Sequence, residues 1–210
     1  MSNIDTTIPV SEVNVDGVTM TLIGSENKVA QIVSKIATEI TAKDLAGATI
    51  ISDYAFYYYS GLTSIEIPEG VTSIGRSAFQ ACTGLTGELV LPNSMITIGQ
   101  AAFNGCMGFT GTLIIPNNVT EIANGAFNGC RGFTSVEIWS GVASIGNSAF
   151  AGCRFDTMTI KATIPPELIN ANAIPSSYVT TIYIPSGALN LYQTATNWSA
   201  FADKFVEKDM

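Results

Sequence analysis

A repeated unit of 22 to 24 residues is the feature that most constrains how this chain can fold. Each unit reads approximately L/F-T-x-Φ-x-Φ-P-x-x-V-T-x-I-G-x-x-A-F-x-G-C-x-G, where Φ is an apolar residue. A degenerate unit precedes the four clear ones, and two incomplete units follow them. Because one unit cannot cover its own apolar face, the units must stack into a solenoid that buries its core between neighbours. The clear units are residues 62–84, 85–108, 109–132 and 133–154.

The first half of each unit has the alternation of a strand that buries one face. In the first clear unit, Ile65 and Ile67 flank Glu66, a period of two residues that is typical of a half-buried strand. A proline then follows in most units and ends the pairing, since proline lacks a backbone N–H. We therefore expect these strands to stack into a curved parallel sheet. The prolines at this position are Pro68, Pro92, Pro116 and Pro185.

The second half of each unit predicts a short helix or 3₁₀ turn. Its apolar residues are three, four, one and three positions apart, which fits a short helix with one buried side. Glycines recur where the chain should reverse, and they would allow tight turns there. The predicted fold class is an α/β solenoid with short helices or turns on the convex side and ladders of phenylalanine and cysteine inside. In the first clear unit the spaced residues are Val71, Ile74, Ala78, Phe79 and Cys82, and the recurrent glycines are Gly75, Gly84, Gly99 and Gly108.

The start of the chain must differ from the repeats, because a solenoid exposes its first and last coils. Residues 1–24 contain alternating patterns on either side of Asp16 and Gly17, which predicts a hairpin or extended segment. Apolar residues spaced three and four positions apart predict a capping helix within residues 25–46. The leucine- and isoleucine-rich repeats then fill residues 47–185.

The end of the chain, residues 186–210, predicts a C-terminal helical cap. Ser186 is placed to cap a helix that begins at Gly187, because serine often accepts a hydrogen bond from the first turn. An apolar stripe along this segment would close the last coil. The stripe consists of Tyr192, Ala195, Trp198, Phe201 and Phe205.

Charge and hydropathy exclude several classes of partner. The formal net charge of −8 repels phosphate backbones and anionic membrane surfaces, so we expect no nucleic-acid partner. No run of eighteen apolar residues occurs, so we expect no membrane insertion. The first residues show neither the basic nor the apolar region of a secretion signal, which favours a cytoplasmic or non-classically exported protein.

The residues available for chemistry argue against catalysis, metal binding and cofactors. The chain has no histidine, which excludes Ser-His-Asp, Cys-His and histidine-zinc sites. It also lacks the glycine-rich phosphate-binding loops and the nucleophile elbow. The four cysteines show no C-x-x-C spacing and share one phase of the repeat, so we predict reduced, buried thiols. We therefore expect no enzyme, no metal site and no cofactor.

The positions that the repeat leaves free are the candidates for binding. Val90 and Ile114 lie at the outward position of neighbouring strands, and Tyr183 occupies it further along. Trp139 stands where other units carry proline. Such residues dominate binding hot spots, but β-branched and aromatic residues also simply favour strands, and both interpretations remain open. The candidate binding residues are Glu66, Val90, Ile114, Glu137, Trp139 and Tyr183.

The repeats closely resemble the BspA-like class of bacterial leucine-rich repeats. The resemblance covers about residues 45–185 and lies in the motifs L-T-S-I-E-I-P at 62–68 and V-T-S-I-G-x-x-A-F at 71–79. Residues 184–201 are also similar to the closing segment that often follows such repeats in gut anaerobes. The resemblance implies a surface or secreted module for adhesion or ligand binding.

Together these observations predict a non-enzymatic recognition module that binds a protein or glycan ligand through the concave face of a leucine-rich repeat solenoid. Glutamates near the apolar positions would favour neutral or basic ligands over anionic ones. The alternative is a structural component of a phage tail or surface appendage that assembles through residues 1–24. The start of the chain is similar to the leaders of prophage-encoded repeat proteins.

Overall fold

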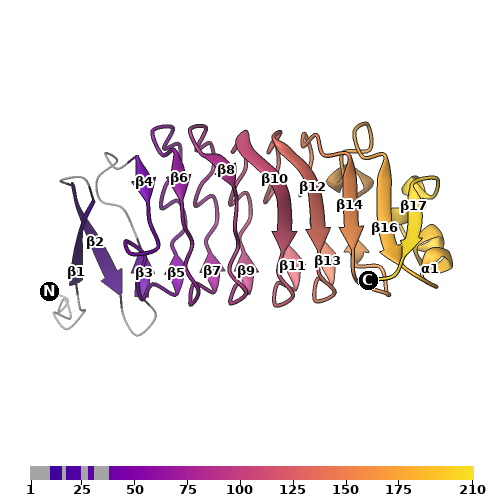
Figure 1. Cartoon of the computed structure of the whole chain (residues 1–210), viewed down its shortest axis with the longest axis horizontal. Helices are drawn as coiled ribbons and strands as arrows, with labels where there is room; N and C mark the ends of the chain where they lie inside the picture. Colours follow the sequence, from indigo (N-terminus) through magenta and orange to yellow (C-terminus); the bar gives the residue numbers. More distant parts are fainter. Residues whose placement is uncertain (1–9, 16–17, 25–27, 31–37) are drawn as a thin grey trace, which may run out of the picture.

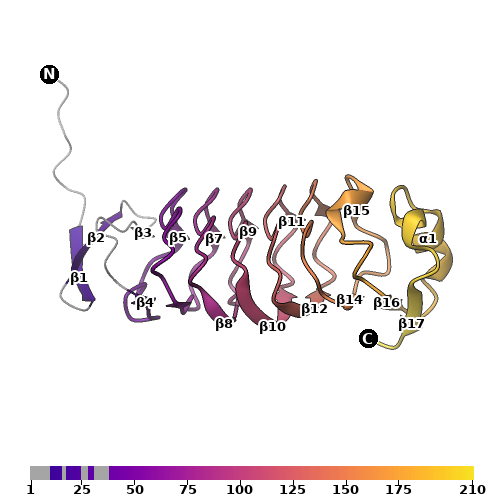
Figure 2. The same cartoon turned by 90° about the horizontal axis from the view of Figure 1, so that it is seen from above.

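The coils of the chain stack along one axis, as a computed structural model shows (Figures 1 and 2). The structure describes residues 10–15, 18–24 and 28–30 as strands, and residues 38–210 with their side chains. The stack is nearly straight in both views. The solenoid therefore lacks most of the curvature that the sequence predicts. Strands line both sides of the solenoid, so both sides advance by the same strand spacing of about 4.8 Å per coil.

The first half of each unit forms a strand, as predicted. These strands build a six-stranded parallel sheet, and two earlier strands form a separate parallel pair. Leu113 and Ile115 are buried while Ile114 between them is exposed, so the alternation expected from the sequence is confirmed. The sheet contains β8 (Thr86–Glu88), β10 (Gly108–Ile115), β12 (Phe133–Ile138), β14 (Thr157–Ile160), β16 (Thr181–Pro185) and β17 (Phe205–Lys208), and the pair is β4 (Glu39–Ile40) with β6 (Ser64–Ile65).

The second half of each unit also forms a strand, which corrects the prediction of short helices there. Six two-residue strands extend a nine-stranded sheet on the opposite side of the solenoid (Figure 2). The three N-terminal strands of the chain complete that sheet. Its members are β1 (Val10–Val15), β2 (Val18–Gly24), β3 (Lys28–Ala30), β5 (Ile50–Ile51), β7 (Ser73–Ile74), β9 (Thr97–Ile98), β11 (Glu121–Ile122), β13 (Ser144–Ile145) and β15 (Glu167–Leu168).

The turn after each of these strands explains why the apolar spacing resembles a helix without being one. Phe79 donates its backbone N–H to Ala102 of the next coil at 2.8 Å, whereas Cys82 donates locally to Phe79 at 3.1 Å. Ser77 and Ala81 have φ of 52° and 58°, in the left-handed region that a continuous helix does not use. Local and inter-coil hydrogen bonds therefore alternate, and the turn joins the ladder between coils.

Two of the recurrent glycines serve close approach between coils. A Cβ at Gly75 would lie 2.4 Å from the backbone nitrogen of Asp53, and one at Gly84 would lie 2.3 Å from the carbonyl oxygen of Ser60. Neither glycine is among the residues with positive φ. These positions require glycine because no side chain fits between the coils.

Ladders of identical side chains fill the core. Phe127 stacks between Phe103 and Phe150, with ring centroids 5.6 Å away on each side and nearly parallel planes. None of the four cysteines forms a disulfide, and all four are buried. The Cys130 thiol donates to the Phe103 carbonyl oxygen at 3.1 Å. Both predicted ladders are confirmed.

The N-terminal segment consists of strands where the structure describes it. β1 and β2 pair antiparallel with Val15 opposite Val18, which agrees with the hairpin predicted around residues 16–17. The capping helix predicted within 25–46 is wrong at β3, which pairs with both β2 and β5, and at β4. β3 and β4 are extended and not helical because each pairs with a strand of the following coil. Residues 31–37 of that predicted helix lie outside the described residues.

The C-terminal cap is helical only in part. Helix α1 (Leu189–Thr194) and a 3₁₀ turn (Trp198–Phe201) are followed by β17, which pairs parallel with β16. Ser186 does not cap the helix. Its hydroxyl donates to Asp209 at 2.7 Å, and the helix starts after Ala188. A further 3₁₀ turn spans Ala171–Ala173.

We expect Phe127→Ala to lower the free energy of unfolding by about 3–5 kcal/mol, because it leaves a cavity in the middle of the aromatic stack. Urea denaturation of the variant measures this loss. Val90→Ala is the matched control, since Val90 is 67% exposed and should change stability by less than about 0.5 kcal/mol. Equal losses in both variants would contradict the inward position of Phe127.

The buried thiols should resist labelling in the native protein. Burial raises the pKa of the Cys153 thiol to about 12 and raises the pKa of Cys130 well above its ordinary value, so almost no reactive thiolate forms at pH 8. We expect a maleimide to label the cysteines only after denaturation, as mass spectrometry can count. Fast labelling of the native protein would show that the ladder opens.

Candidate functional site

A groove of about 420 Å³ lies on the outer face of the six-stranded sheet. It brings together three of the six candidate residues, Val90, Ile114 and Trp139, from three successive coils. Their side chains are 67%, 46% and 41% exposed. Glu66, Glu137 and Tyr183 do not line it. The groove is lined by Glu88, Leu89, Val90, Leu91, Asn93, Thr112, Ile114, Pro116, Asn117, Asn118 and Trp139.

The groove forms where two neighbouring coils stop pairing. β8 pairs with β10 only through Gly108, Phe109 and Thr110, and the register of β10 then shifts between Gly111 and Thr112. Within residues 38–210, the backbone of residues 89–91 makes no hydrogen bond. In Figure 1, β10 begins beside β8 and then runs away from the following part of that coil.

One extra residue in each of these coils accompanies the separation. The units that begin at Leu85 and Phe109 carry one additional residue, a glycine directly after the threonine, which the units beginning at Leu62 and Phe133 lack. The inserted glycines, Gly87 and Gly111, have φ of 78° and 75°, where other residues are strained. This insertion is the sequence signal that indicates the position of the groove. The alternation of inward and outward residues does not reveal it.

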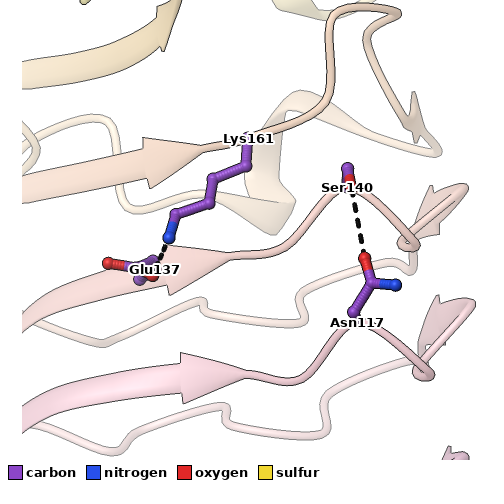
Figure 3. A network of polar contacts seen from close by, with 4 residues as sticks. All are labelled: Asn117, Glu137, Ser140 and Lys161. Carbon is purple, nitrogen blue, oxygen red and sulfur yellow. Dashed lines mark hydrogen bonds and ion pairs between the residues drawn. The ribbon is translucent and has the colours of Figure 1, made fainter. Parts of the chain in front are cut away.

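Trp139 is held by the coil that follows it. The Lys161 ammonium lies 4.1 Å from the centre of the indole ring and 2.6 Å from the Glu137 carboxylate (Figure 3). The Trp139 backbone N–H also donates to Ile115 at 3.2 Å, a bond that proline at this position cannot make. The replacement of proline by tryptophan thus adds one inter-coil bond and one cation–π contact.

The ends of the groove are held by hydrogen bonds between loops. Asn117 accepts from the Ser140 hydroxyl at 3.1 Å, as Figure 3 shows, and from the Gly141 N–H at 3.0 Å. The Asn93 N–H donates to Glu69 at 2.9 Å. This bond is the main cause that lowers the pKa of the Glu69 carboxyl, and burial opposes it. The loops are therefore fixed before any ligand arrives.

The electrostatics of the groove are acidic. The Glu88 side chain is exposed and forms no hydrogen bond or ion pair within residues 38–210. Lys161 is neutralised by Glu137. Of the remaining candidates, Glu66 accepts from the Ala42 N–H at 3.1 Å, and Tyr183 lies under the Lys208 ammonium at 5.2 Å. Glu88 is the residue whose charge is available to a ligand in the groove.

The described part of the chain contains neither a cluster of metal-binding side chains nor a membrane-spanning helix. No group of three or more histidine, cysteine, aspartate or glutamate side chains there could hold a metal ion. No helix in the same residues is long and apolar enough to cross a membrane.

The stacked coils, with one parallel strand on each side and a turn between them, define a repeat solenoid of the leucine-rich type. The model of the BspA type leucine rich repeat region matches residues 49–173 in six copies, and the chain belongs to this family. Solenoids of this kind are typical protein-interaction scaffolds, and the family and fold are generally non-catalytic.

Three solved structures share the fold. A leucine-rich repeat protein from Bacteroides ovatus is 21% identical with a TM-score of 0.60, over 88% of this chain and 55% of that one. The pneumococcal vaccine antigen PcpA is 22% identical with a TM-score of 0.67, over 95% of this chain and 48% of that one. A leucine-rich repeat protein from T. pallidum is 22% identical with a TM-score of 0.53, over 77% of this chain and 85% of that one.

These similarities establish the architecture alone, because every identity is below one quarter. The chain spans about half the length of the first two proteins. No protein with curated annotation matches the chain.

We expect the contact between Trp139 and Lys161 to contribute about 0.5–1 kcal/mol of coupling. A double-mutant cycle of Trp139→Ala and Lys161→Met, followed by urea denaturation, measures this coupling separately from the ion pair with Glu137. Each single variant should remain folded, since Trp139 is partly exposed. Additive losses would show that the ring and the ammonium do not interact in solution.

Proposed function

We propose that this chain is a non-enzymatic recognition module that binds a protein or glycan ligand through the outer face of its six-stranded sheet. One observation carries the proposal, namely the groove in which Val90, Ile114 and Trp139 meet. Adhesion at a cell surface is the setting that the family resemblance favours. The rigid solenoid would present the groove without folding on binding.

The composition of the groove supports a binding role. Its lining combines aliphatic side chains and one tryptophan with asparagine, threonine and glutamate side chains. A small apolar centre with a polar rim is the usual anatomy of a recognition site. Aliphatic residues that only served strand formation would not need the two inserted glycines, Gly87 and Gly111, at the point where the coils separate.

The charge of the chain supports neutral or basic ligands. The net charge is −8, and Glu88 lies unpaired beside the apolar residues of the groove. An anionic ligand would meet repulsion both at long range and at this carboxylate.

The alternative proposal, a structural component of a phage tail or surface appendage, has one observation in its favour. β1 occupies the end of the nine-stranded sheet and pairs only with β2 among the described residues. An edge strand of this kind can pair with another chain. Sedimentation of the full chain and of a chain lacking residues 1–24 distinguishes the two, because only the appendage component should lose its assembly.

Ligand binding should depend on Trp139 and not on Tyr183. Once a glycan array or a set of purified surface proteins yields a ligand, we expect Trp139→Ala to lower affinity by at least about 2 kcal/mol, or roughly thirtyfold. Tyr183→Ala is the matched control, because Tyr183 lies outside the groove and beneath Lys208. Both variants should melt near the parent temperature. Unchanged affinity in a folded Trp139 variant would place the function elsewhere.

A further inference from the structure

We infer that the groove accepts an extended peptide segment, which pairs its backbone with the free edge of β10 and presents a lysine or arginine side chain to Glu88. This inference rests on the proposed function and names the class of ligand. It follows from three properties of the groove: backbone groups without partners, aliphatic walls, and an unpaired carboxylate.

The backbone of β10 has a free edge inside the groove. The Trp139 N–H donates to the Ile115 carbonyl oxygen, so Ile115 directs its polar backbone groups toward β12. Because these directions alternate along a strand, Ile114 and Thr112 direct theirs toward residues 89–91. No hydrogen bond joins them to those residues within the described chain.

A peptide strand is the ligand that matches such an edge. Unpaired N–H and C=O groups along a strand bind extended peptides by strand addition, and alternate side chains of the peptide then enter pockets. The edge at Thr112 and Ile114 lies in the same groove as the Val90 and Trp139 side chains. An apolar residue of the peptide would pack on Val90 and Ile114 while its backbone bonds to β10.

The charge of Glu88 selects a basic residue in the peptide. A Cβ at Gly111 would lie 3.2 Å from a Glu88 carboxylate oxygen, so the Glu88 side chain lies over the bulge where the free edge begins. Lys161, the cation that lies over Trp139, is already paired with Glu137. A lysine or arginine of the ligand would therefore form the ion pair that Glu88 lacks.

A glycan fits the same groove less well. At the exposed aliphatic side chains of Val90 and Ile114 its hydroxyl groups would find no hydrogen bonds, which leaves only the polar side chains of the lining to bind them. One face of the Trp139 ring, the natural platform for a sugar, is already covered by the Lys161 ammonium at 4.1 Å. The groove thus favours a peptide.

The probe for this inference is a phage-displayed library of random linear heptapeptides, selected on the full chain. An Ile114→Lys variant serves as counter-selection, and Thr159→Lys is its matched control. Thr159 has the outward position of β14, where both neighbouring strands are paired. We expect enriched peptides to alternate apolar and polar residues and to carry lysine or arginine. They should bind the Thr159 variant and lose at least tenfold in affinity for the Ile114 variant.

Two measurements on an enriched synthetic peptide test its backbone and its charge. N-methylation of every second amide removes the donors of one edge, and on one of the two edges it should reduce affinity at least tenfold. Glu88→Gln should weaken binding at least threefold, whereas Glu121→Gln, the same change on the exposed side of β11, should not. Glu88→Gln also keeps the test decisive if Ile114→Lys fails to fold.

The outcomes separate this inference from the proposed function. Failure to enrich peptides over the Ile114 variant, enrichment of acidic peptides, or tolerance of N-methylation on both edges would overturn the peptide inference. If a neutral oligosaccharide instead binds the parent chain and not the Ile114 or Trp139 variants, the groove is a recognition site for glycans. If no ligand depends on these residues, both proposals fail.

Discussion

Each coil of this chain donates backbone N–H groups to the coil beside it, on both sheets and at the turns between them. The bonds from Phe79 to Ala102 and from Trp139 to Ile115 are examples. This parallel bonding sets the spacing at which equivalent side chains meet, and the stacked rings of Phe103 and Phe127 follow from it. The ladders of the core stay continuous because the buried side chains of neighbouring coils keep this register.

The groove is the place where the chain departs from that register. The inserted Gly87 and Gly111 allow β8 and β10 to bulge. Residues 89–91 form no hydrogen bond with the edge of β10. Leu89 and Leu91 nevertheless remain almost fully buried at 4% and 8% exposure, so the core below is not opened. The groove thus forms where a few hydrogen bonds are missing on the outside, while the packing inside is retained.

The Trp139 cluster shows how one departure from the repeat adds contacts between coils beside the groove. Proline at this position ends a strand, whereas tryptophan both bonds to Ile115 and extends a ring beside the groove. Lys161 fixes that ring and is itself fixed by Glu137. Preorganisation of this kind lowers the entropy that a ligand must overcome on binding.

The sequence by itself determined the repeat, the inward and outward residues of each strand, and the phenylalanine and cysteine ladders, because a period of 22 to 24 residues repeats the same burial pattern. It also identified Val90, Ile114 and Trp139 as outward residues. It failed for the second half of each unit and for β3, because apolar spacing of three and four residues does not tell a helix from a turn that bonds to the next coil. Only the tertiary structure decided that Val90, Ile114 and Trp139 form a groove and that Tyr183 lies apart from it, since the place where pairing between two coils stops depends on hydrogen bonds between residues more than twenty positions apart.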